Sequence, residues 1–188
     1  LPFTEATVLF GAKSTDSIFA YPKTAESLEG YVYEVNNGVI DRLPISGFAL
    51  NAAASNRNIL YSITKDKVYS SILYNNTDRT EVSLPAGIIA EKCSFTEETD
   101  EVVCGLDATS KKNNVTNWFK GIVASSDDIW TIDTFSGEME LLAHPPELVG
   151  RSIDITNPFI NKDGSHFYFI NKADGGLWVF DRTINEGQ

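Results

Sequence analysis

Residues 157–182 read NPFINKDGSHFYFINKADGGLWVFDR and contain the pattern that decides the fold. Two apolar segments, 158–160 and 167–170, flank the polar turn at 162–165, and a third segment at 177–181 follows a Gly-rich turn. Short, aromatic-rich apolar runs bounded by Gly, Asp and Ser are typical of antiparallel β-strands joined by tight turns. The stretch therefore predicts three consecutive strands.

The same order of strand, turn, strand, gap and strand occurs in three earlier stretches of the chain. The second strands of the four units begin at Ile18, Ile59, Val102 and Phe167, so the steps between them are 41, 43 and 65 residues. A period of about 40 to 45 residues is the length of a four-stranded propeller blade. The excess in the third step lies at 108–127, which we interpret as a loop insertion within one blade.

The residues between the expected strands favour tight turns. Asn37-Gly38 separates the strand at 31–35 from Val39-Ile40, and an Asn-Gly pair readily adopts the two positive φ values of a type I′ turn. No segment has a sustained apolar period of 3.6 residues, so very little helix is expected.

The stretch 157–182 resembles the WD40-like repeats of TolB-type β-propellers, and so does 133–138, where a strand-end Asp precedes Ser-Gly-Glu. The resemblance covers about residues 6–182. The Trp-Asp and Gly-His dipeptides of true WD40 repeats are absent, so the resemblance implies a fold and carries over no functional residues. The expected fold is all-β, a β-propeller of about four blades of four antiparallel strands or part of a larger propeller.

A single propeller domain over 1–188 is expected. Its blades are predicted at roughly 6–46, 47–87, 88–150 and 151–188, with the insertion at 108–127 in the third. The fourth blade has only 183–188 after its third strand, so its outer strand must come from that tail, from the N-terminal segment or from another chain. The sequence begins at Leu1 rather than Met, which indicates a processed product or a piece of a longer chain.

Composition excludes several classes of protein. The 188 residues include 15 Lys and Arg against 26 Asp and Glu, and the net charge of −11 argues against a nucleic-acid binder. Hydrophobic residues make up 42% of the chain, which is enough to bury a core. No apolar run approaches the roughly 18 to 20 residues that cross a bilayer, so no membrane span is expected in this chain.

The two cysteines, Cys93 and Cys104, lie in the two strands of one expected hairpin. If they face each other, Phe95 opposes Val102 and the tip falls at Glu98-Thr99, a self-consistent register. Directly opposed residues in antiparallel strands are close enough for a disulfide. We therefore predict a disulfide and an extracytoplasmic setting, whether secreted, periplasmic or at the cell surface; two buried thiols are the alternative.

The expected loops contain two kinds of candidate surface site. Asn75 and Asn114 begin Asn-x-Thr sequons in expected loops, where either a glycan or a chance match explains them. Trp118-Phe119 lies in the insertion, outside the repeat pattern, and is the best candidate for a contact surface. Folding back over its own blade is the alternative for this aromatic pair.

The residues needed for catalysis are scarce. His144 and His166 are the only histidines, and the chain has no nucleophile elbow, phosphate-binding loop or dinucleotide fingerprint. Two histidines and two oxidised cysteines do not make a convincing zinc site, and Asp127-Asp128 lacks the spacing of a calcium loop and is interpreted as a solvated acidic rim. We expect no catalytic residue, no cofactor and no metal, and no enzyme activity in this chain alone.

These observations give one leading function and two alternatives. The leading hypothesis is a non-catalytic, extracytoplasmic β-propeller module that binds a protein partner or self-associates, as an interaction or surface-assembly scaffold. The first alternative is the propeller portion of a larger hydrolase or lyase, which would make the chain part of an enzyme. The second is a glycan-binding propeller that uses Trp118.

Overall fold

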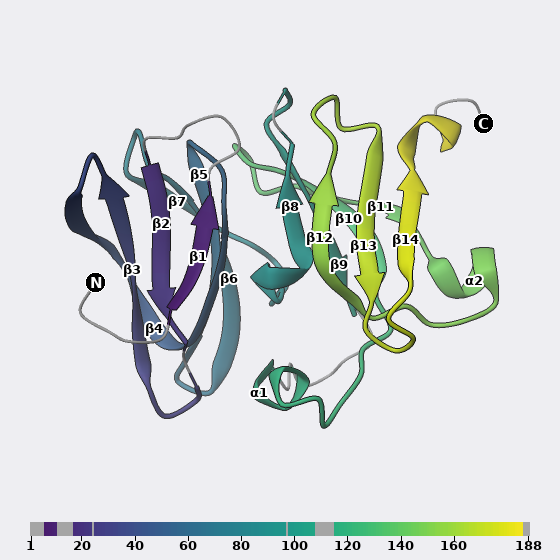
Figure 1. Ribbon diagram of the computed structural model, residues 1–188, viewed down its shortest axis with the longest axis horizontal. Helices are drawn as coiled ribbons and strands as arrows, with labels where there is room; N and C mark the ends of the chain where they lie inside the picture. Colours follow the sequence, from purple (N-terminus) through teal and green to yellow (C-terminus); the bar gives the residue numbers. More distant parts are fainter. Residues whose placement is uncertain (1–5, 11–16, 24, 97, 108–114, 186–188) are drawn as a thin grey trace. The chain divides into compact units, whose positions relative to one another are not determined.

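The computed structural model describes residues 6–10, 17–23, 25–96, 98–107 and 115–185, and it is built almost entirely of antiparallel β-sheet. The chain divides into two compact units, unit 1 (residues 1–90) and unit 2 (residues 91–188). In Figure 1, unit 1 is coloured purple to blue and unit 2 teal to yellow. The all-β class predicted from the repeats is confirmed.

Unit 1 contains a seven-stranded sheet in which each strand pairs with the next one in the sequence. Its strands are β1 (Ala6–Phe10), β2 (Ser17–Pro22), β3 (Glu29–Asn36), β4 (Val39–Ala54), β5 (Asn58–Lys65), β6 (Val68–Asn75) and β7 (Thr80–Ser83). The 16-residue β4 pairs with β3 through its first half and with β5 through its second. The residues assigned to the first two blades therefore share one hydrogen-bonded sheet, and the division into four blades stays a prediction.

The core of unit 1 follows from the alternation of side chains along its strands. Phe19 and Tyr21 of β2 point to one face of the sheet, where they pack in one buried cluster with Ile59, Tyr61 and Tyr74 of β5 and β6. Successive residues of a strand point to opposite faces, so the residues between them in β2 lie on the other face. The sheet thus folds over on itself and buries one face of each half.

The turn between β3 and β4 has the conformation expected from its sequence. Asn37 and Gly38 have φ values of 49° and 80°, so both central residues are in the left-handed region that a type I′ hairpin requires.

Among its described residues, unit 2 contains two antiparallel sheets, two short α-helices (α) and two short 3-10 helices (η), the first of which begins at Ala90. The four-stranded sheet has the order β11-β10-β9-β8, and the three-stranded sheet has the order β12-β13-β14. The elements are η1 (Ala90–Lys92), β8 (Cys93–Phe95), β9 (Glu101–Leu106), α1 (Val115–Phe119), β10 (Asp128–Asp133), β11 (Met139–Ala143), α2 (Pro145–Val149), β12 (Ile155–Ile160), β13 (His166–Asn171), β14 (Leu177–Asp181) and η2 (Arg182–Asn185).

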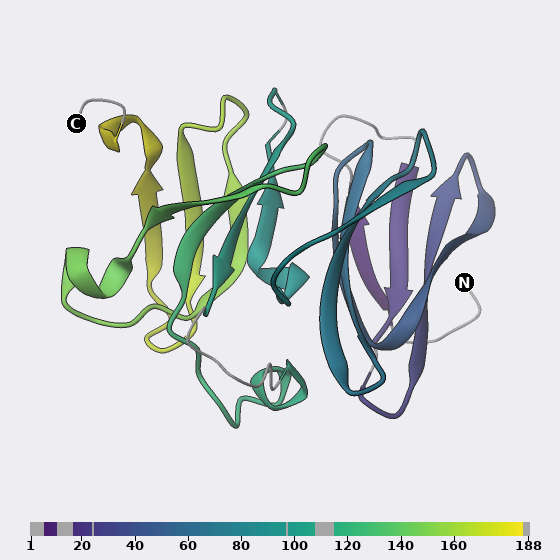
Figure 2. The same cartoon turned by 180° about the vertical axis from the view of Figure 1, so that it is seen from behind.

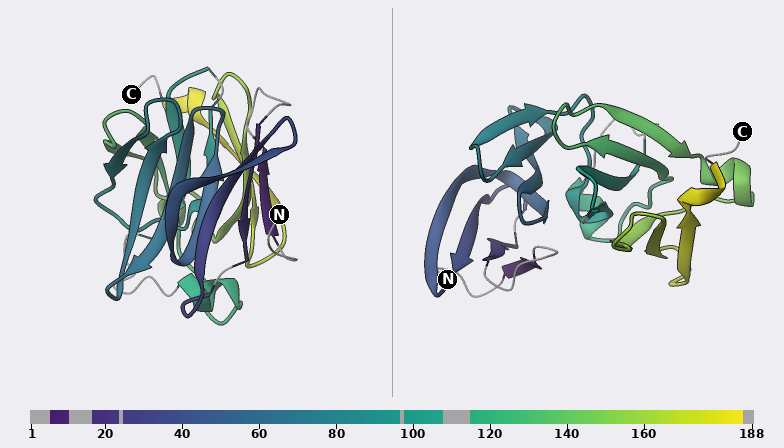
Figure 3. Two further views of the ribbon diagram at one scale, coloured as in Figure 1. Left: turned by 90° about the vertical axis from the view of Figure 1, so that its left-hand side faces the viewer. Right: turned by 90° about the horizontal axis from the view of Figure 1, so that it is seen from above.

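The two sheets of unit 2 pack face to face around a shared core. Val103 and Ile129 of the four-stranded sheet lie in one buried cluster with Phe167 and Phe169 of the three-stranded sheet. The three-stranded sheet lies in front of the other in Figure 1 and behind it in Figure 2, and Figure 3 shows the same two layers from the side and from above. A Cβ added to Gly105 would lie 2.8 Å from Ile155 Cδ1, so the absence of a side chain there permits this close approach.

Cys93 and Cys104 are joined by a disulfide between neighbouring strands of unit 2. Their Cα atoms are 4.1 Å apart, and the register pairs Cys93 with Cys104 and Phe95 with Val102. This is the register that the sequence predicts. The bond ties the short β8 to the centre of the four-stranded sheet.

Removing the disulfide is expected to destabilise unit 2 by about 2–3 kcal/mol, because a crosslink across a short loop restricts the unfolded chain. The Cys93→Ala/Cys104→Ala variant tests this by urea unfolding followed by tryptophan fluorescence. A reducing agent should lower the stability of the wild type by a similar amount and leave the variant unchanged. Equal stability of the oxidised and reduced wild type would contradict the prediction.

Candidate interaction surface

The outward face of the three-stranded sheet is apolar and largely uncovered. Leu177 and Val179 of β14, the edge strand of this sheet, are 72% and 53% exposed. The register places Val179 beside Tyr168 and Leu177 beside Ile170, so these side chains form contiguous rows on one face. We call this surface the C-terminal apolar face and define it as Phe159, Tyr168, Ile170, Leu177 and Val179. Contiguous apolar surfaces of this kind mark interaction sites.

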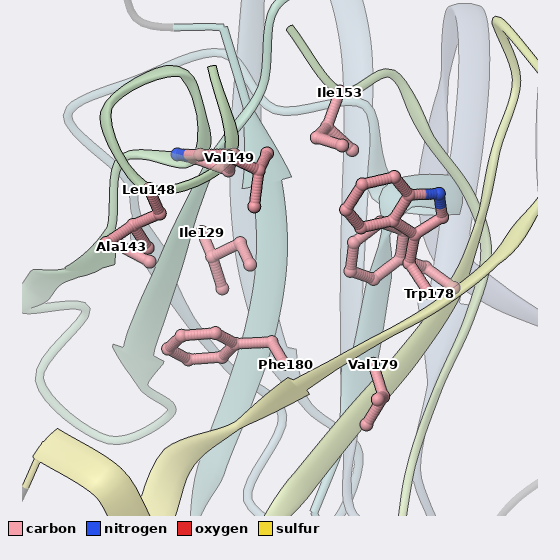
Figure 4. A pocket seen from close by; sticks show the side chains of 10 residues that line it. Ile129, Ala143, Leu148, Val149, Ile153, Trp178, Val179 and Phe180 are labelled. Carbon is pink, nitrogen blue, oxygen red and sulfur yellow. The ribbon is translucent and has the colours of Figure 1, made fainter. Parts of the chain in front are cut away.

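A partly open pocket of about 60 Å³ lies in unit 2, on the opposite side of β14. Figure 4 shows Trp178 and Phe180 directed into it, toward the side of Ile153 and Ile129, whereas Val179 points away from it. The lining is almost entirely apolar and comes from α2 and strands of both sheets. The guanidinium of Arg151 lies 4.6 Å from the centre of the Trp178 ring. One face of β14 therefore lines this pocket, and its other face forms part of the C-terminal apolar face.

A buried ion cluster holds the insertion against the sheets of unit 2. Lys92, just before β8, is 2% exposed, and its Nζ donates hydrogen bonds to Asp127 Oδ2 at 2.6 Å and to Asp154 Oδ1 at 2.9 Å. It also donates to Ser125 Oγ. The backbone N–H of Ile155 donates to Asp127 Oδ2 at 2.7 Å. One ammonium group thus links three segments that are far apart in the sequence.

Helix α1 joins this cluster through its tryptophan. Trp118 Nε1 donates to Asp154 Oδ1 at 2.7 Å, and the Lys92 Nζ lies 4.6 Å from the centre of the indole ring. The Lys172 Nζ lies 3.8 Å from the ring centre and donates to the Trp118 carbonyl oxygen at 2.6 Å. Two cations over one ring make a favourable cation–π arrangement. These contacts fix α1 in place.

The two aspartates of the cluster have opposite pKa shifts. Burial raises the pKa of the Asp127 carboxyl, and the charge and hydrogen bond of Lys92 offset this only in part. Burial also acts to raise the pKa of Asp154, but hydrogen bonds from Lys92, Trp118 and Ser125, with the charge of Lys92, outweigh it and leave that pKa below its usual value. Asp154 is therefore the principal anionic partner of Lys92.

No family model matches the chain, and no curated protein sequence is similar to it. Among solved structures, TolB from Acinetobacter baumannii is similar with a TM-score of 0.61 at 10% identity, over 94% of this chain and 40% of that one. A putative TolB from Agrobacterium tumefaciens gives 0.58 at 10% identity over 88% and 61%. The β-propeller domain of the Trilobed protease from Pyrococcus furiosus gives 0.55 at 11% identity over 95% and 56%.

The fold is that of a TolB-type β-propeller. This confirms the resemblance drawn from the repeat pattern. The chain spans between 40% and 61% of the length of these three structures, so it corresponds to part of each of them. At about 10% identity the likeness concerns the fold alone.

The two aromatic residues of the insertion, Trp118 and Phe119, differ in their exposure to solvent. Trp118 is 5% exposed and packs inside unit 2, against Lys92 of its own predicted blade and against Asp154 and Lys172 of the range predicted for the fourth blade. Phe119 is 43% exposed, and its ring meets the Trp118 ring edge-on at 5.1 Å. Only Phe119 remains available for a contact at this place.

The described residues include one of the two sequon asparagines. Asn75 ends β6, and its side-chain oxygen accepts hydrogen bonds from the backbone N–H groups of Thr77 and Asp78. Asn114 lies outside the described residues. Use of either site for glycosylation stays a prediction.

The histidines and acidic residues lie apart from one another or inside structural contacts. His144 pairs with Asp128 through its Nδ1, and His166 contacts Ser165 Oγ at 2.7 Å. Asp127 is 1% exposed, so the interpretation of Asp127-Asp128 as a solvated acidic rim is wrong for Asp127, because Lys92 and the Ile155 amide draw it inward. Within the described ranges, no group of three or more His, Cys, Asp and Glu is placed to hold a metal ion. The helices of the described part include none long and apolar enough to cross a membrane.

Sequence reasoning missed both the ion cluster and the C-terminal apolar face. In the sequence, Glu91 and Lys92 separate the apolar residues 88–90 from residues 93–95, which read Cys-Ser-Phe. This is a weak signal that a charged side chain lies near buried strands. Its partners are 35 and 62 residues away, so no local spacing connects them. Residues 177–180 are apolar at every position, so the sequence does not show which face of this strand is exposed.

Proposed function

We propose that this TolB-type propeller chain is a non-catalytic interaction module that works outside the cytoplasm as a protein-binding or surface-assembly scaffold. The observation that carries the proposal is the C-terminal apolar face, where Leu177 and Val179 stand exposed on a regular sheet. Leaving such a surface in water is unfavourable, and covering it with a partner releases about 25 cal/mol per Å² of apolar area. The Cys93–Cys104 disulfide supports an oxidising compartment.

Site-specific photo-crosslinking in the source cells tests this function. A benzophenone amino acid in place of Leu177 should give a crosslinked adduct with a protein, which can be another copy of the chain, in the extracytoplasmic fraction. The same replacement at Val68, which is 64% exposed in unit 1, is the control and should give none. Absence of an adduct specific to position 177, or recovery of the chain only from the cytoplasm, contradicts the proposal.

A second candidate is the propeller portion of a larger hydrolase. It is favoured by one of the similar structures, which is the β-propeller domain of a protease and matches 95% of this chain. The coding sequence on either side of the chain decides this question. A hydrolase domain encoded next to residues 1–188 would favour the second candidate, and the absence of such a domain on both sides would count against it.

A further inference from the structure

The buried ion cluster of unit 2 brings an amine and a carboxyl group into contact inside the core. Lys92 and Asp127 are 2% and 1% exposed, and Lys92 Nζ lies 2.6 Å from Asp127 Oδ2. The Trp118 ring, with the whole residue 5% exposed, lies 4.6 Å from the same nitrogen. A buried charge has given up its hydration, so a reaction that removes the charge of Lys92 relieves an unfavourable term.

The two oxygens of the Asp127 carboxyl group have different surroundings. Oδ2 accepts the hydrogen bond from Lys92 and a second one, at 2.7 Å, from the backbone N–H of Ile155. Oδ1 is buried and has no hydrogen-bond partner among the described residues. Burial raises the pKa of this carboxyl, which favours its protonated form. Because an anionic oxygen without a donor is unfavourable in the core, the proton belongs on Oδ1.

Asp154 is the complementary group of the cluster, because it stays anionic. Its carboxylate accepts hydrogen bonds from Trp118 Nε1, from the Ser125 hydroxyl and backbone N–H, and from Lys92 Nζ at 2.9 Å. Burial acts to raise its pKa, but the contacts with Lys92, Trp118 and Ser125 outweigh burial and lower it. The Lys92 amine therefore lies between a protonated carboxyl and a carboxylate that accepts protons.

We propose that Lys92 and Asp127 condense into an intramolecular isopeptide bond, an amide between the two side chains, with Asp154 as the proton acceptor. Asp154 removes a proton from the Lys92 ammonium, and the lone pair of Nζ then attacks Asp127 Cγ. The electron pair of the carbonyl bond moves to Oδ2, where the Ile155 N–H stabilises the negative charge. Asp154 passes its proton to Oδ1, which leaves as water with the electron pair of the Cγ–Oδ1 bond. Asp154 then takes the second proton from the new amide nitrogen.

This reaction balances without any further reagent. Its products are one amide, one water molecule and a protonated Asp154, so the buried positive and negative charges disappear together. Two groups that the fold holds in contact react at a high effective concentration, which favours a condensation that is slow between free molecules. The structure shows the groups before the bond forms, and the ion-pair contacts and pKa shifts of this cluster belong to that state. The inference does not depend on the proposed scaffold function.

Intact-mass measurement of the purified chain, after reduction of its disulfide, tests the isopeptide bond. Wild type should weigh less than its sequence requires by the mass of one water molecule. Proteolytic digestion should release a branched peptide that joins the segments around Lys92 and Asp127. Lys92→Arg is the matched control, because it keeps the positive charge but replaces the amine with a guanidinium that stays protonated. It should have the full mass, and so should Asp127→Ala and Asp154→Asn.

The branched peptide distinguishes this bond from another loss of water. Asp163 and Asp174 each precede a glycine, and an Asp-Gly pair loses water when it closes a succinimide ring. That loss would persist in Lys92→Arg and would give no branched peptide.

Three results overturn the inference. They are a wild type of full mass, a loss of water without a branched peptide, and a branched peptide that joins Lys92 to a residue other than Asp127. Each of them is read from the wild type alone, so the inference stays falsifiable even if a variant does not fold.

Discussion

The variant Lys92→Met is expected to lower the free energy of unfolding of unit 2 by about 3–5 kcal/mol at pH 7. Lys92 is fully buried and is the cation that Asp127 and Asp154 share, at 2.6 and 2.9 Å. Methionine has a similar length and preserves packing, but it leaves two buried carboxylates without a counter-charge. Removing one partner of a buried ion pair costs far more than the pair contributes, because the remaining charge is not solvated.

Urea unfolding monitored by tryptophan fluorescence is a specific measurement for this variant. The three tryptophans of the chain, Trp118, Trp130 and Trp178, all lie in unit 2, so the signal reports on that unit. Lys162→Met is the matched control, because Lys162 is exposed and pairs with Glu98 at 3.7 Å. A surface pair of this kind contributes little, and the control should stay within about 0.5 kcal/mol of wild type.

The pH dependence separates loss of charge pairing from loss of packing. In wild type the pKa of Asp154 is lowered, so its contribution is present above the unfolded pKa of about 3.9 and is lost as pH falls through the folded pKa. In Lys92→Met, burial without the ammonium raises the carboxyl pKa values, so the contribution of these groups to stability is fully present below the unfolded pKa and is lost as pH rises through the raised folded pKa. The difference between the two proteins should therefore shrink between pH 7 and pH 4.5. A constant difference would indicate a packing defect.

The parts of the fold that could be predicted are those in which the signal is local. The Cys93–Cys104 register follows from two hairpin strands of known spacing, and Asn37-Gly38 determines the turn between its strands by backbone chemistry alone. The spacing of the repeated strands matches the length of a propeller blade, and the repeated strands predict the all-β class. Each of these inferences needs only a few residues close together in the sequence.

The parts that could not be predicted depend on contacts between distant segments. β4 continues without a break from one repeat into the next, although it contains Pro44 and Gly47, because its two halves pair with different strands. The Lys92 cluster joins positions 92, 127 and 154, and only the packed sheets bring them together. A charged residue in an apolar context shows that a partner is needed but does not say which one.

Trp118 shows how composition alone misleads about a site. An aromatic pair in an insertion is a reasonable contact surface, and Phe119 is exposed as such a surface requires. Trp118 instead donates to Asp154, and the Lys92 and Lys172 ammonium groups lie 4.6 and 3.8 Å from its ring centre. The insertion therefore supplies part of the core of unit 2, which repeat counting could not show.

The variant Trp118→Ala is expected to lower the free energy of unfolding of unit 2 by about 3–5 kcal/mol, the usual cost of removing a large buried aromatic side chain. The loss combines the cavity with the missing hydrogen bond to the Asp154 carboxylate, which keeps its hydrogen bonds from the Lys92 Nζ, the Ser125 hydroxyl and the Ser125 backbone N–H. Fluorescence of Trp130 and Trp178 still reports the urea transition.

Two further variants divide this effect and test its alternative. Trp118→Phe keeps much of the ring but removes the Nε1 donor, so a smaller loss of about 1–2 kcal/mol is expected from the buried carboxylate that loses a partner. Phe119→Ala is the neighbouring control and should cost about 1 kcal/mol or less, since its ring is 43% exposed. If Trp118→Ala unfolded at the same urea concentration as wild type, the indole would have no structural role, and the contact-surface hypothesis would apply to Trp118 after all.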